Sequence, residues 1–194
     1  MKVRIIMNNS DRRVIKTKSA IKDAMKSLMV KYNDYMDITI KELCDKANIN
    51  RRTFYLHYNA IDDVLIDIEE DFIQDFFQRT KEYDHIIDLE PVIGAFFDLH
   101  EENPVYQKLV LSPTQDYLRE ILRSRTVSKL DENDNLKRIR HLNNDIQGMI
   151  EQYFHMSVVS IYREWIRQHR KMKKEEVVKL AASLIKNGIS SLVK

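Results

Sequence analysis

Two adjacent arginines and a group of aromatic and hydroxyl side chains lie close together between Thr39 and Tyr58. The pattern in this segment predicts two short helices joined by a tight turn. The second helix would present five side chains outward: Arg51, Arg52, Thr53, Tyr55 and His57. Such a pair of helices is the sequence form of a helix-turn-helix, which lays its second helix in the major groove of DNA. The chemistry that these residue types indicate is therefore non-covalent recognition of DNA.

The first of the two helices is expected to begin after Thr39. A threonine followed three residues later by Glu42 forms a capping box, in which the hydroxyl accepts a free backbone N–H and the carboxylate reaches back to the cap. Apolar side chains then recur at helical spacing on one face: Ile40, Leu43, Cys44 and Ala47. We expect Cys44 to be a buried packing residue.

Two asparagines define the turn and the start of the second helix. Asparagine tolerates a left-handed backbone, so Asn48 can end the first helix, and Asn50 is a good N-cap for the second. Ile49, Phe54 and Tyr58 would then face the core. A plain helical hairpin with a solvated basic face fits the same residues, so this alternative stays open here.

The charges are distributed unevenly along the chain. Residues 1–58 carry 13 Lys and Arg against 6 Asp and Glu, a balance of +7, whereas residues 59–194 carry 19 against 24, a balance of −5. A basic N-terminal part suits the neutralisation of phosphates, and an acidic remainder discourages non-specific coating of DNA. This asymmetry favours the DNA-binding interpretation.

Residues 11–65 resemble the N-terminal DNA-binding domain of the TetR/AcrR transcriptional regulators. The matching segments are a basic first helix and the parts of the helix-turn-helix: Asp11–Met25, Ile38–Leu43, Ala47–Asn50, Thr53–Tyr58 and Val64–Leu65. The resemblance implies that seven side chains contact DNA: Thr39, Lys41, Arg51, Arg52, Thr53, Tyr55 and His57. It implies base-edge and phosphate contacts from the start of the second helix and backbone contacts from its aromatic end.

Three positions depart from the family pattern. Members usually carry Gly where Asn48 stands, a small residue at Arg52 and a phosphate-binding Lys at Ile61. The segment Tyr153–Ile166 also resembles the C-terminal domains of a subgroup typical of Gram-positive bacteria, some of which act through a partner protein. The alternative function is therefore a TetR-like co-activator that works through a partner protein, with weak or no direct operator binding.

The composition predicts an all-α chain, because it holds only 3 Gly and 3 Pro and no stretch of sustained two-residue alternation. We expect a three-helix DNA-binding domain over residues 1–58, with a flexible arm over 1–10. A larger helical ligand-binding and dimerisation domain should follow over 59–194. Outside the helix-turn-helix, we expect helices over 11–31, 60–81, 90–100, 104–111, 113–125, 144–168 and 174–193, and a long loop over 126–143.

The last two expected helices carry apolar stripes that exceed the needs of one core. The family resemblance implies that they form a four-helix bundle in a homodimer, with these interface candidates: Ser157, Ile161, Trp165, Ala181, Leu184 and Gly188. Two recognition helices about 34–36 Å apart would read successive major grooves, so the operator should be an inverted repeat. The stripes are equally compatible with the chain's own core.

Aromatic side chains with a few polar groups in the second domain suggest a small-molecule pocket. Its candidate residues are Phe96, Phe97, His100, Tyr117, Met149 and Tyr153. An aromatic stripe at helical spacing is also what a packed core shows. The family resemblance implies a ligand-responsive repressor, whose effector would change the distance or angle between two DNA-binding domains.

The sequence lacks the signatures of enzymes, metal sites and membrane spans. Three isolated glycines cannot build a phosphate-binding loop, and one cysteine excludes both an internal disulfide and a zinc-binding cysteine pair. No apolar run is long enough to cross a bilayer. We therefore expect a cytoplasmic regulator that is not an enzyme and uses no cofactor or metal.

Overall fold

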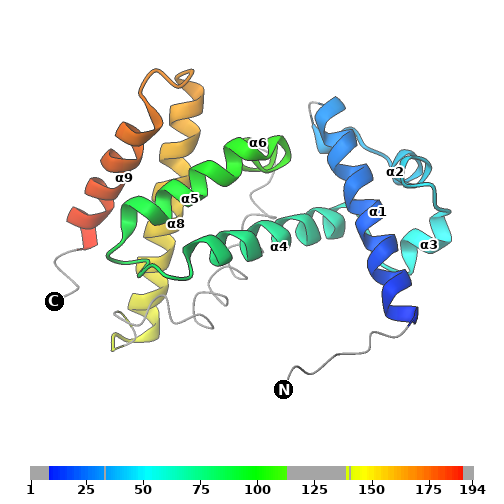
Figure 1. The fold of residues 1–194 in the computed structure, drawn as a ribbon, viewed down its shortest axis with the longest axis horizontal. Coiled ribbons are helices and arrows are strands. Elements are labelled where there is room, and N and C mark those ends of the chain that lie inside the picture. Colours follow the sequence, from blue (N-terminus) through cyan, green and yellow to red (C-terminus); the bar gives the residue numbers. More distant parts are fainter. Residues whose placement is uncertain (1–8, 33, 113–138, 140, 190–194) are drawn as a thin grey trace. The chain divides into compact units, whose positions relative to one another are not determined.

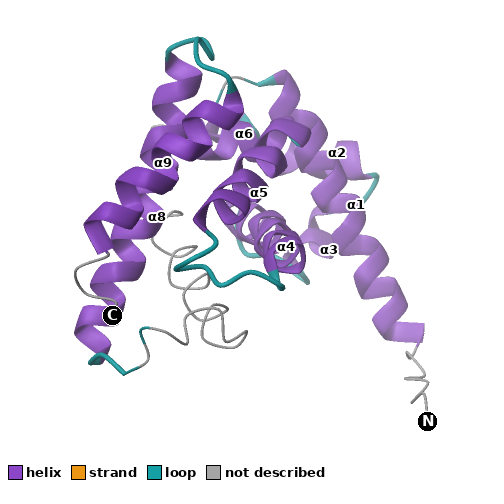
Figure 2. Cartoon of the chain, turned by 60° about the vertical axis from the view of Figure 1, so that its left-hand side comes forward, coloured by secondary structure: helices purple, strands orange, loops and turns teal. Residues whose placement is uncertain are grey.

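The computed structural model describes residues 9–32, 34–112, 139 and 141–189. Every regular element in these ranges is helical, as predicted (Figures 1 and 2). The elements are α1 (Asn9–Lys31), η1 (Tyr35–Asp37), α2 (Ile40–Ala47), α3 (Arg51–Tyr55), α4 (Ile61–Thr80), α5 (Leu89–Glu102), α6 (Pro104–Leu111), α8 (Asn144–Arg167) and α9 (Lys174–Ile189). Contacts divide the chain into two compact units, Met1–Glu69 and Glu70–Lys194, here called the N-terminal and C-terminal units.

One apolar core holds the helices of the N-terminal unit together. On α1, the core face is formed by Ile21, Met25 and Leu28, which are all buried. Buried side chains from the other helices join them: Leu43, Cys44, Phe54, Tyr58, Val64, Leu65 and Ile68. Each large apolar side chain contributes roughly 1.5–3 kcal/mol when it is fully buried. The core therefore holds α2, α3 and the start of α4 against α1.

The C-terminal unit is built around α5, α8 and α9. Helix α9 packs against both α5 and α8, and Figures 1 and 2 show α8 and α9 side by side. In the core, the Phe97 ring lies 4.9 Å from the Tyr162 ring and 5.5 Å from that of Trp165. At the surface, Lys174 at the start of α9 forms ion pairs with Asp98 and Glu101 of α5.

The helix ends agree with the local chemistry of the sequence. Asn103 caps α6 by accepting the Val105 N–H at 3.0 Å, and Pro104 follows in the first turn, where its missing N–H costs no helical hydrogen bond. Asn9 and Ser10, expected in a flexible arm, belong to α1.

Some expectations fall outside the described residues: the arm over 1–8, the helix over 113–125, most of the loop over 126–143 and the end of the last helix. The functional boundary after residue 58 stays a prediction, while the compact N-terminal unit continues to Glu69. Among the helices described, none combines the length and the apolar character that a bilayer-spanning segment requires.

Two histidines are buried in the C-terminal unit. His85 and His100 are 2% and 4% exposed. The Thr80 hydroxyl donates to the Phe76 carbonyl, so Nε2–H of His85 must donate to Thr80 Oγ1 at 3.0 Å. His100 donates from Nδ1 to the Phe96 carbonyl at 2.7 Å. Burial lowers the pKa of both imidazoles to about 4, although for His100 the hydrogen bond to the Phe96 carbonyl acts in the opposite direction.

These histidines should make the chain less stable in acid. A folded-state pKa near 4 lies below the ordinary value of 6.5, so the unfolded chain binds more protons between these pH values. The free energy of unfolding should therefore fall as the pH drops through this window, by at most about 1.4 kcal/mol per pH unit for each histidine. Denaturant titrations of wild type and His100→Gln, followed by circular dichroism, would measure the slope. It should be smaller in His100→Gln than in the wild type; equal slopes in the two proteins would contradict the assignment.

Candidate nucleic-acid interface

Local hydrogen bonds define both helices of the helix-turn-helix. Thr39 Oγ1 accepts the Glu42 N–H at 3.2 Å, and Asn50 Oδ1 accepts the Thr53 N–H at 2.8 Å. Between them, Asn48 ends α2 in the left-handed region, with φ 53° and ψ 47°. The predicted cap at Thr39, turn at Asn48 and N-cap at Asn50 are therefore confirmed.

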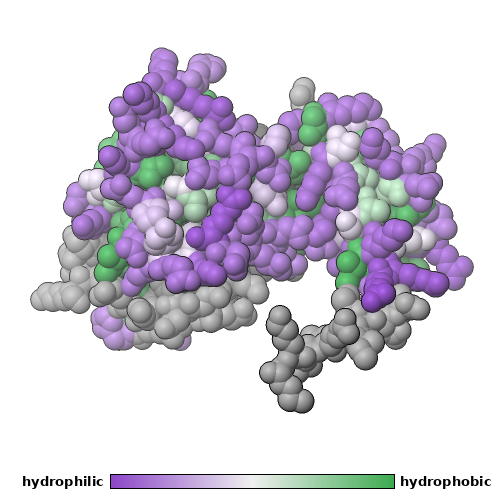
Figure 3. Space-filling view, in the orientation of Figure 1, coloured by the Kyte–Doolittle hydropathy of each residue, from purple (hydrophilic) through white to green (hydrophobic). Residues whose placement is uncertain are grey.

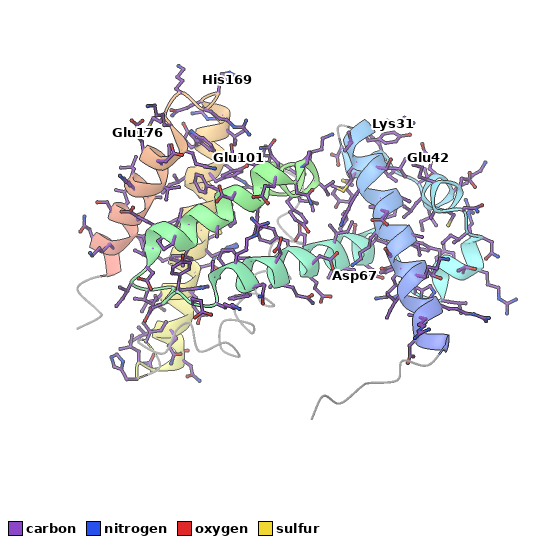
Figure 4. All side chains as sticks on the ribbon, in the orientation of Figure 1. Lys31, Glu42, Asp67, Glu101, His169 and Glu176 are labelled. Carbon is purple, nitrogen blue, oxygen red and sulfur yellow. The ribbon has the colours of Figure 1, made fainter. Side chains whose placement is uncertain are left out.

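The Glu42 side chain has a different main partner from the one that the capping box predicts. Its carboxylate accepts a hydrogen bond from the Tyr32 hydroxyl and lies 3.6 Å from Lys31 Nζ (Figure 4). The hydrogen bond from Tyr32 is the main reason why the pKa of Glu42 lies below its usual value. The contact joins the C-terminal end of α1 to the first turn of α2. Sequence reasoning missed it because Tyr32 lies ten residues before Glu42, beyond any local motif.

Buried aromatic packing fixes the orientation of α3. The Phe54 side chain is 0% exposed, and its ring lies 5.9 Å from the ring of Tyr58, which is 4% exposed. Both residues face the core as predicted, whereas Ile49 is only half-buried. A helix of five residues forms too few hydrogen bonds to be stable alone. The burial of Phe54 therefore determines which side of α3 faces solvent.

The structure leaves all seven predicted DNA-contacting residues accessible. Five are exposed: Thr39, Lys41, Arg51, Arg52 and Tyr55. Thr53 and His57 are half-buried, and the Thr53 hydroxyl is held by Asn50 Oδ1 at 3.0 Å. The seven come from α2, α3 and the residues at their ends, so the helix-turn-helix brings them together on one small element.

Three of these residues carry charges that no carboxylate among the described residues neutralises. Within the described part of the chain, Lys41, Arg51 and Arg52 form no ion pair. Several other cations of the N-terminal unit are paired: Lys18 and Lys22 with Asp67, and Lys31 with Glu42. The start of α3 therefore presents an unneutralised positive charge to solvent, which suits contact with phosphates and base edges.

Cys44 lies beneath the same helices and is 2% exposed, which confirms its predicted burial. Burial raises the pKa of its thiol, while the nearby positive charge of Arg51 acts in the opposite direction. The net rise favours the protonated thiol, which is unreactive, and fits a packing role for Cys44.

The candidate pocket residues of the C-terminal unit lie in different environments. Phe97 and His100 are in the packed core, and Phe96 is half-buried with its ring 4.1 Å from that of His100. Met149 and Tyr153 are 71% and 43% exposed on α8. Tyr117 lies outside the described residues. The structure thus groups the three α5 residues, while the two α8 residues lie on the surface, and a ligand site there stays a prediction.

The candidate dimer residues also separate into two groups. Trp165 and Ala181 belong to the chain's own core, and Trp165 Nε1 donates to the Met172 carbonyl at 2.9 Å. Leu184 and Gly188 are exposed, whereas Ser157 and Ile161 are half-buried. Only the second group has surface that a partner could cover.

Comparisons with known proteins agree with the helix-turn-helix. No protein-family model matches the chain. A stretch of 70 residues is 40% identical to the uncharacterized HTH-type transcriptional regulator YxbF of Bacillus subtilis. This match spans 36% of the chain and 16% of YxbF, so it concerns only a small part of that protein.

Solved structures resemble the chain over most of its length. The crystal structure of a TetR transcriptional regulator from Streptococcus agalactiae has a TM-score of 0.66 and 27% sequence identity, over 91% of this chain and 97% of the other. A protein assigned to the TetR family of transcription regulators, from Shewanella sp. PV-4, has a TM-score of 0.65 over 89% of this chain and 97% of its own. At 14% sequence identity, this second protein shares only its fold with the chain.

Substitutions at Asn48 should separate backbone conformation from side-chain chemistry. Glycine adopts a positive φ without a Cβ clash, so Asn48→Gly should retain the stability of the wild type, whereas Asn48→Ala should destabilise the chain by about 1 kcal/mol. Urea denaturation followed by circular dichroism would measure both. If Asn48→Ala proved as stable as Asn48→Gly, the left-handed turn would not be a requirement of the fold.

Proposed function

We propose that this chain, a TetR-family transcriptional regulator, binds an inverted-repeat operator as a homodimer and represses transcription until an effector releases it from the DNA. The observation that carries the DNA-binding part is the start of α3, where Arg51 and Arg52 are exposed and lack carboxylate partners within the described residues. The proposal assigns α3 to the major groove. A helix placed there reads base edges with its first residues while its neighbours grip phosphates.

The seven accessible residues divide into two proposed roles. Arg51, Arg52 and Thr53 are in the first turn of α3 and would contact base edges and nearby phosphates. The remaining four would bind the DNA backbone: Thr39, Lys41, Tyr55 and His57. The N–H groups at the start of α2 would add to the phosphate contact of Thr39, because a helix N-terminus attracts anions.

An apolar surface on α8 and α9 supports the homodimer. On α8, exposed side chains recur at helical spacing: Ile146, Met149, Tyr153 and Met156. On α9, Leu180 and Leu184 are 46% and 53% exposed. The Tyr153 hydroxyl occupies the place that a Cβ at Gly188 would take, so the two helices approach closely there. Figure 3 shows green, apolar areas on the side of the C-terminal unit that carries α9.

Large exposed apolar patches on a soluble domain mark interaction sites, and two copies of one such surface form a symmetric interface. We therefore propose that a second copy of this chain covers Leu180, Leu184 and the exposed α8 side chains. Of the predicted interface residues, Ser157, Ile161 and Gly188 stay in the proposal. Trp165 and Ala181 instead support the surface from within the chain's core.

Regulation requires that the dimer has two states with different operator affinities. An effector bound to the C-terminal unit can shift their populations only by as much as it prefers one state over the other. Release of DNA would follow when the favoured state no longer matches the spacing of the major grooves.

Replacing Arg51 with alanine should weaken operator binding by about tenfold or more, because a paired contact to a base or phosphate is worth roughly 1–3 kcal/mol. The assay is a gel shift with DNA from beside the protein's own coding region, repeated over a range of salt concentrations. The dependence of log affinity on log salt should become shallower by about one unit for each phosphate that the variant no longer neutralises. Tyr55→Phe, which removes a hydroxyl alone, should weaken binding to a smaller degree.

Lys171→Ala is a matched control, since it also removes one exposed cation but lies in the turn between α8 and α9. It should leave both affinity and salt dependence unchanged. Unaltered binding by both Arg51→Ala and Tyr55→Phe would contradict the proposal that α3 contacts DNA.

A charge placed on the proposed dimer surface should separate the protomers. Leu184→Glu should weaken dimerisation by about tenfold or more, because burying an unpaired carboxylate in an apolar interface is costly. Sedimentation velocity over a series of protein concentrations would measure it. Ser183→Glu introduces the same side chain at an exposed neighbouring position of α9 and should leave the dimer intact. Equal behaviour of the two variants would place the interface elsewhere.

A further inference from the structure

One carboxylate of the N-terminal unit joins three side chains from two other segments. Asp67 lies on α4, where its Oδ2 accepts the Tyr58 hydroxyl at 2.5 Å and Lys18 Nζ at 3.0 Å. Its Oδ1 lies 3.7 Å from Lys22 Nζ. Figure 4 labels Asp67 on this part of α4. We call the four residues Lys18, Lys22, Tyr58 and Asp67 the Asp67 cluster.

The Asp67 cluster differs from a loose surface ion pair. The side chains of Asp67 and Lys22 are only 18% and 17% exposed, and Lys18 Nζ lies over the Tyr58 ring, 5.1 Å from its centre. Burial raises the pKa of Asp67, but the hydrogen bonds from Tyr58 and Lys18 and the charge of Lys22 outweigh it and hold the pKa below its usual value. Asp67 is therefore ionised at neutral pH and keeps its partners in place.

The Asp67 cluster connects directly to the recognition helix. Tyr58 N–H donates to the Phe54 carbonyl at 3.0 Å, and the rings of Tyr58 and Phe54 are neighbours in the core. Phe54 is the buried anchor of α3. A shift of Tyr58 would therefore be passed to Phe54, and through it to the exposed side of α3.

We infer that Asp67 is a positioning residue for DNA binding: it holds Tyr58 against α1 and so fixes the orientation in which α3 presents its arginines. This inference rests on the proposed function of α3. It also assigns a use to the hydroxyl of Tyr58, because a phenylalanine there would fill the same apolar space without reaching Asp67.

The positioning role predicts an effect opposite in sign to that of simple electrostatics. A negative charge in a DNA-binding unit repels phosphates, so its removal alone should tighten DNA binding. Asparagine in place of Asp67 leaves only a neutral amide oxygen to accept from the Tyr58 hydroxyl, so this substitution should weaken the positioning hydrogen bond and, with it, DNA binding. Asp67→Asn therefore distinguishes the two effects by the direction of the change. Asp62→Asn is the matched control, because Asp62 lies about one and a half helical turns earlier on α4, in the same unit, and forms no hydrogen bond within the described residues.

The experiment uses the full-length chain and a duplex enriched by the wild type from a random-sequence library. Fluorescence anisotropy gives the dissociation constant of each variant, and a stoichiometric titration gives its active fraction. Asp67→Asn and Tyr58→Phe should each weaken binding by about tenfold, the scale of one hydrogen bond to a charged group, with the active fraction and salt dependence unchanged. The double variant should be little weaker than either single one, since both substitutions act on the same hydrogen bond. Asp62→Asn should bind as tightly as wild type or more tightly.

The outcomes separate the failure of the inference from that of the proposed function. If wild type enriches no duplex, or Arg51→Ala binds as tightly as wild type, the proposed function fails and the inference fails with it. If Arg51→Ala binds weakly but Asp67→Asn binds as tightly as Asp62→Asn, only the inference is overturned. A decrease that appears solely as a lower active fraction would assign Asp67 a purely structural role and overturn it as well. If Asp67→Asn does not fold, Tyr58→Phe decides alone: unchanged affinity overturns the inference.

Discussion

A helix of five residues cannot hold its conformation in water, and the proposed DNA interface depends on such a helix. Three constraints outside its exposed face give α3 its direction. Asn48 adopts a left-handed backbone conformation that turns the chain, Asn50 caps the N-terminus of α3, and Phe54 packs in the core beneath α3. The exposed side of α3 is consequently not needed for the fold, so under the proposed function its residues are free to vary with the operator sequence.

Ion pairing divides the cations of the N-terminal unit into two sets. Lys18, Lys22 and Lys31 are paired with carboxylates and join α1 to the other helices. Lys41, Arg51 and Arg52 have no such partner in the described residues. The basic balance of residues 1–58 therefore overstates the charge that is available to DNA, and the location of the unpaired cations is more informative than their number. Lys18 and Lys22 of the Asp67 cluster belong to the paired set. In the inference above, the cluster positions the helix that carries the unpaired arginines.

Predictions from the sequence succeeded where the deciding residues are neighbours in the chain. The cap at Thr39, the turn at Asn48 and the N-cap at Asn50 each depend on groups within three residues, and the structure has all of them. Helical periodicity likewise placed Leu43 and Cys44 in the core. Asp67 could not be predicted, because its partner Lys18 is 49 residues away. Periodicity also could not decide whether an apolar stripe packs against a partner or against the chain's own core. Two residues expected at the dimer interface, Trp165 and Ala181, lie inside the core.

In the proposed complex, two copies of α3 occupy successive major grooves of one duplex. Methylation interference tests it most directly, because guanine N7 lies in the major groove and adenine N3 in the minor groove. Methylation of guanine N7 should therefore block binding in two segments, about 10 base pairs apart and related by an inverted repeat. Interference confined to adenine N3, or to a single segment, would contradict it.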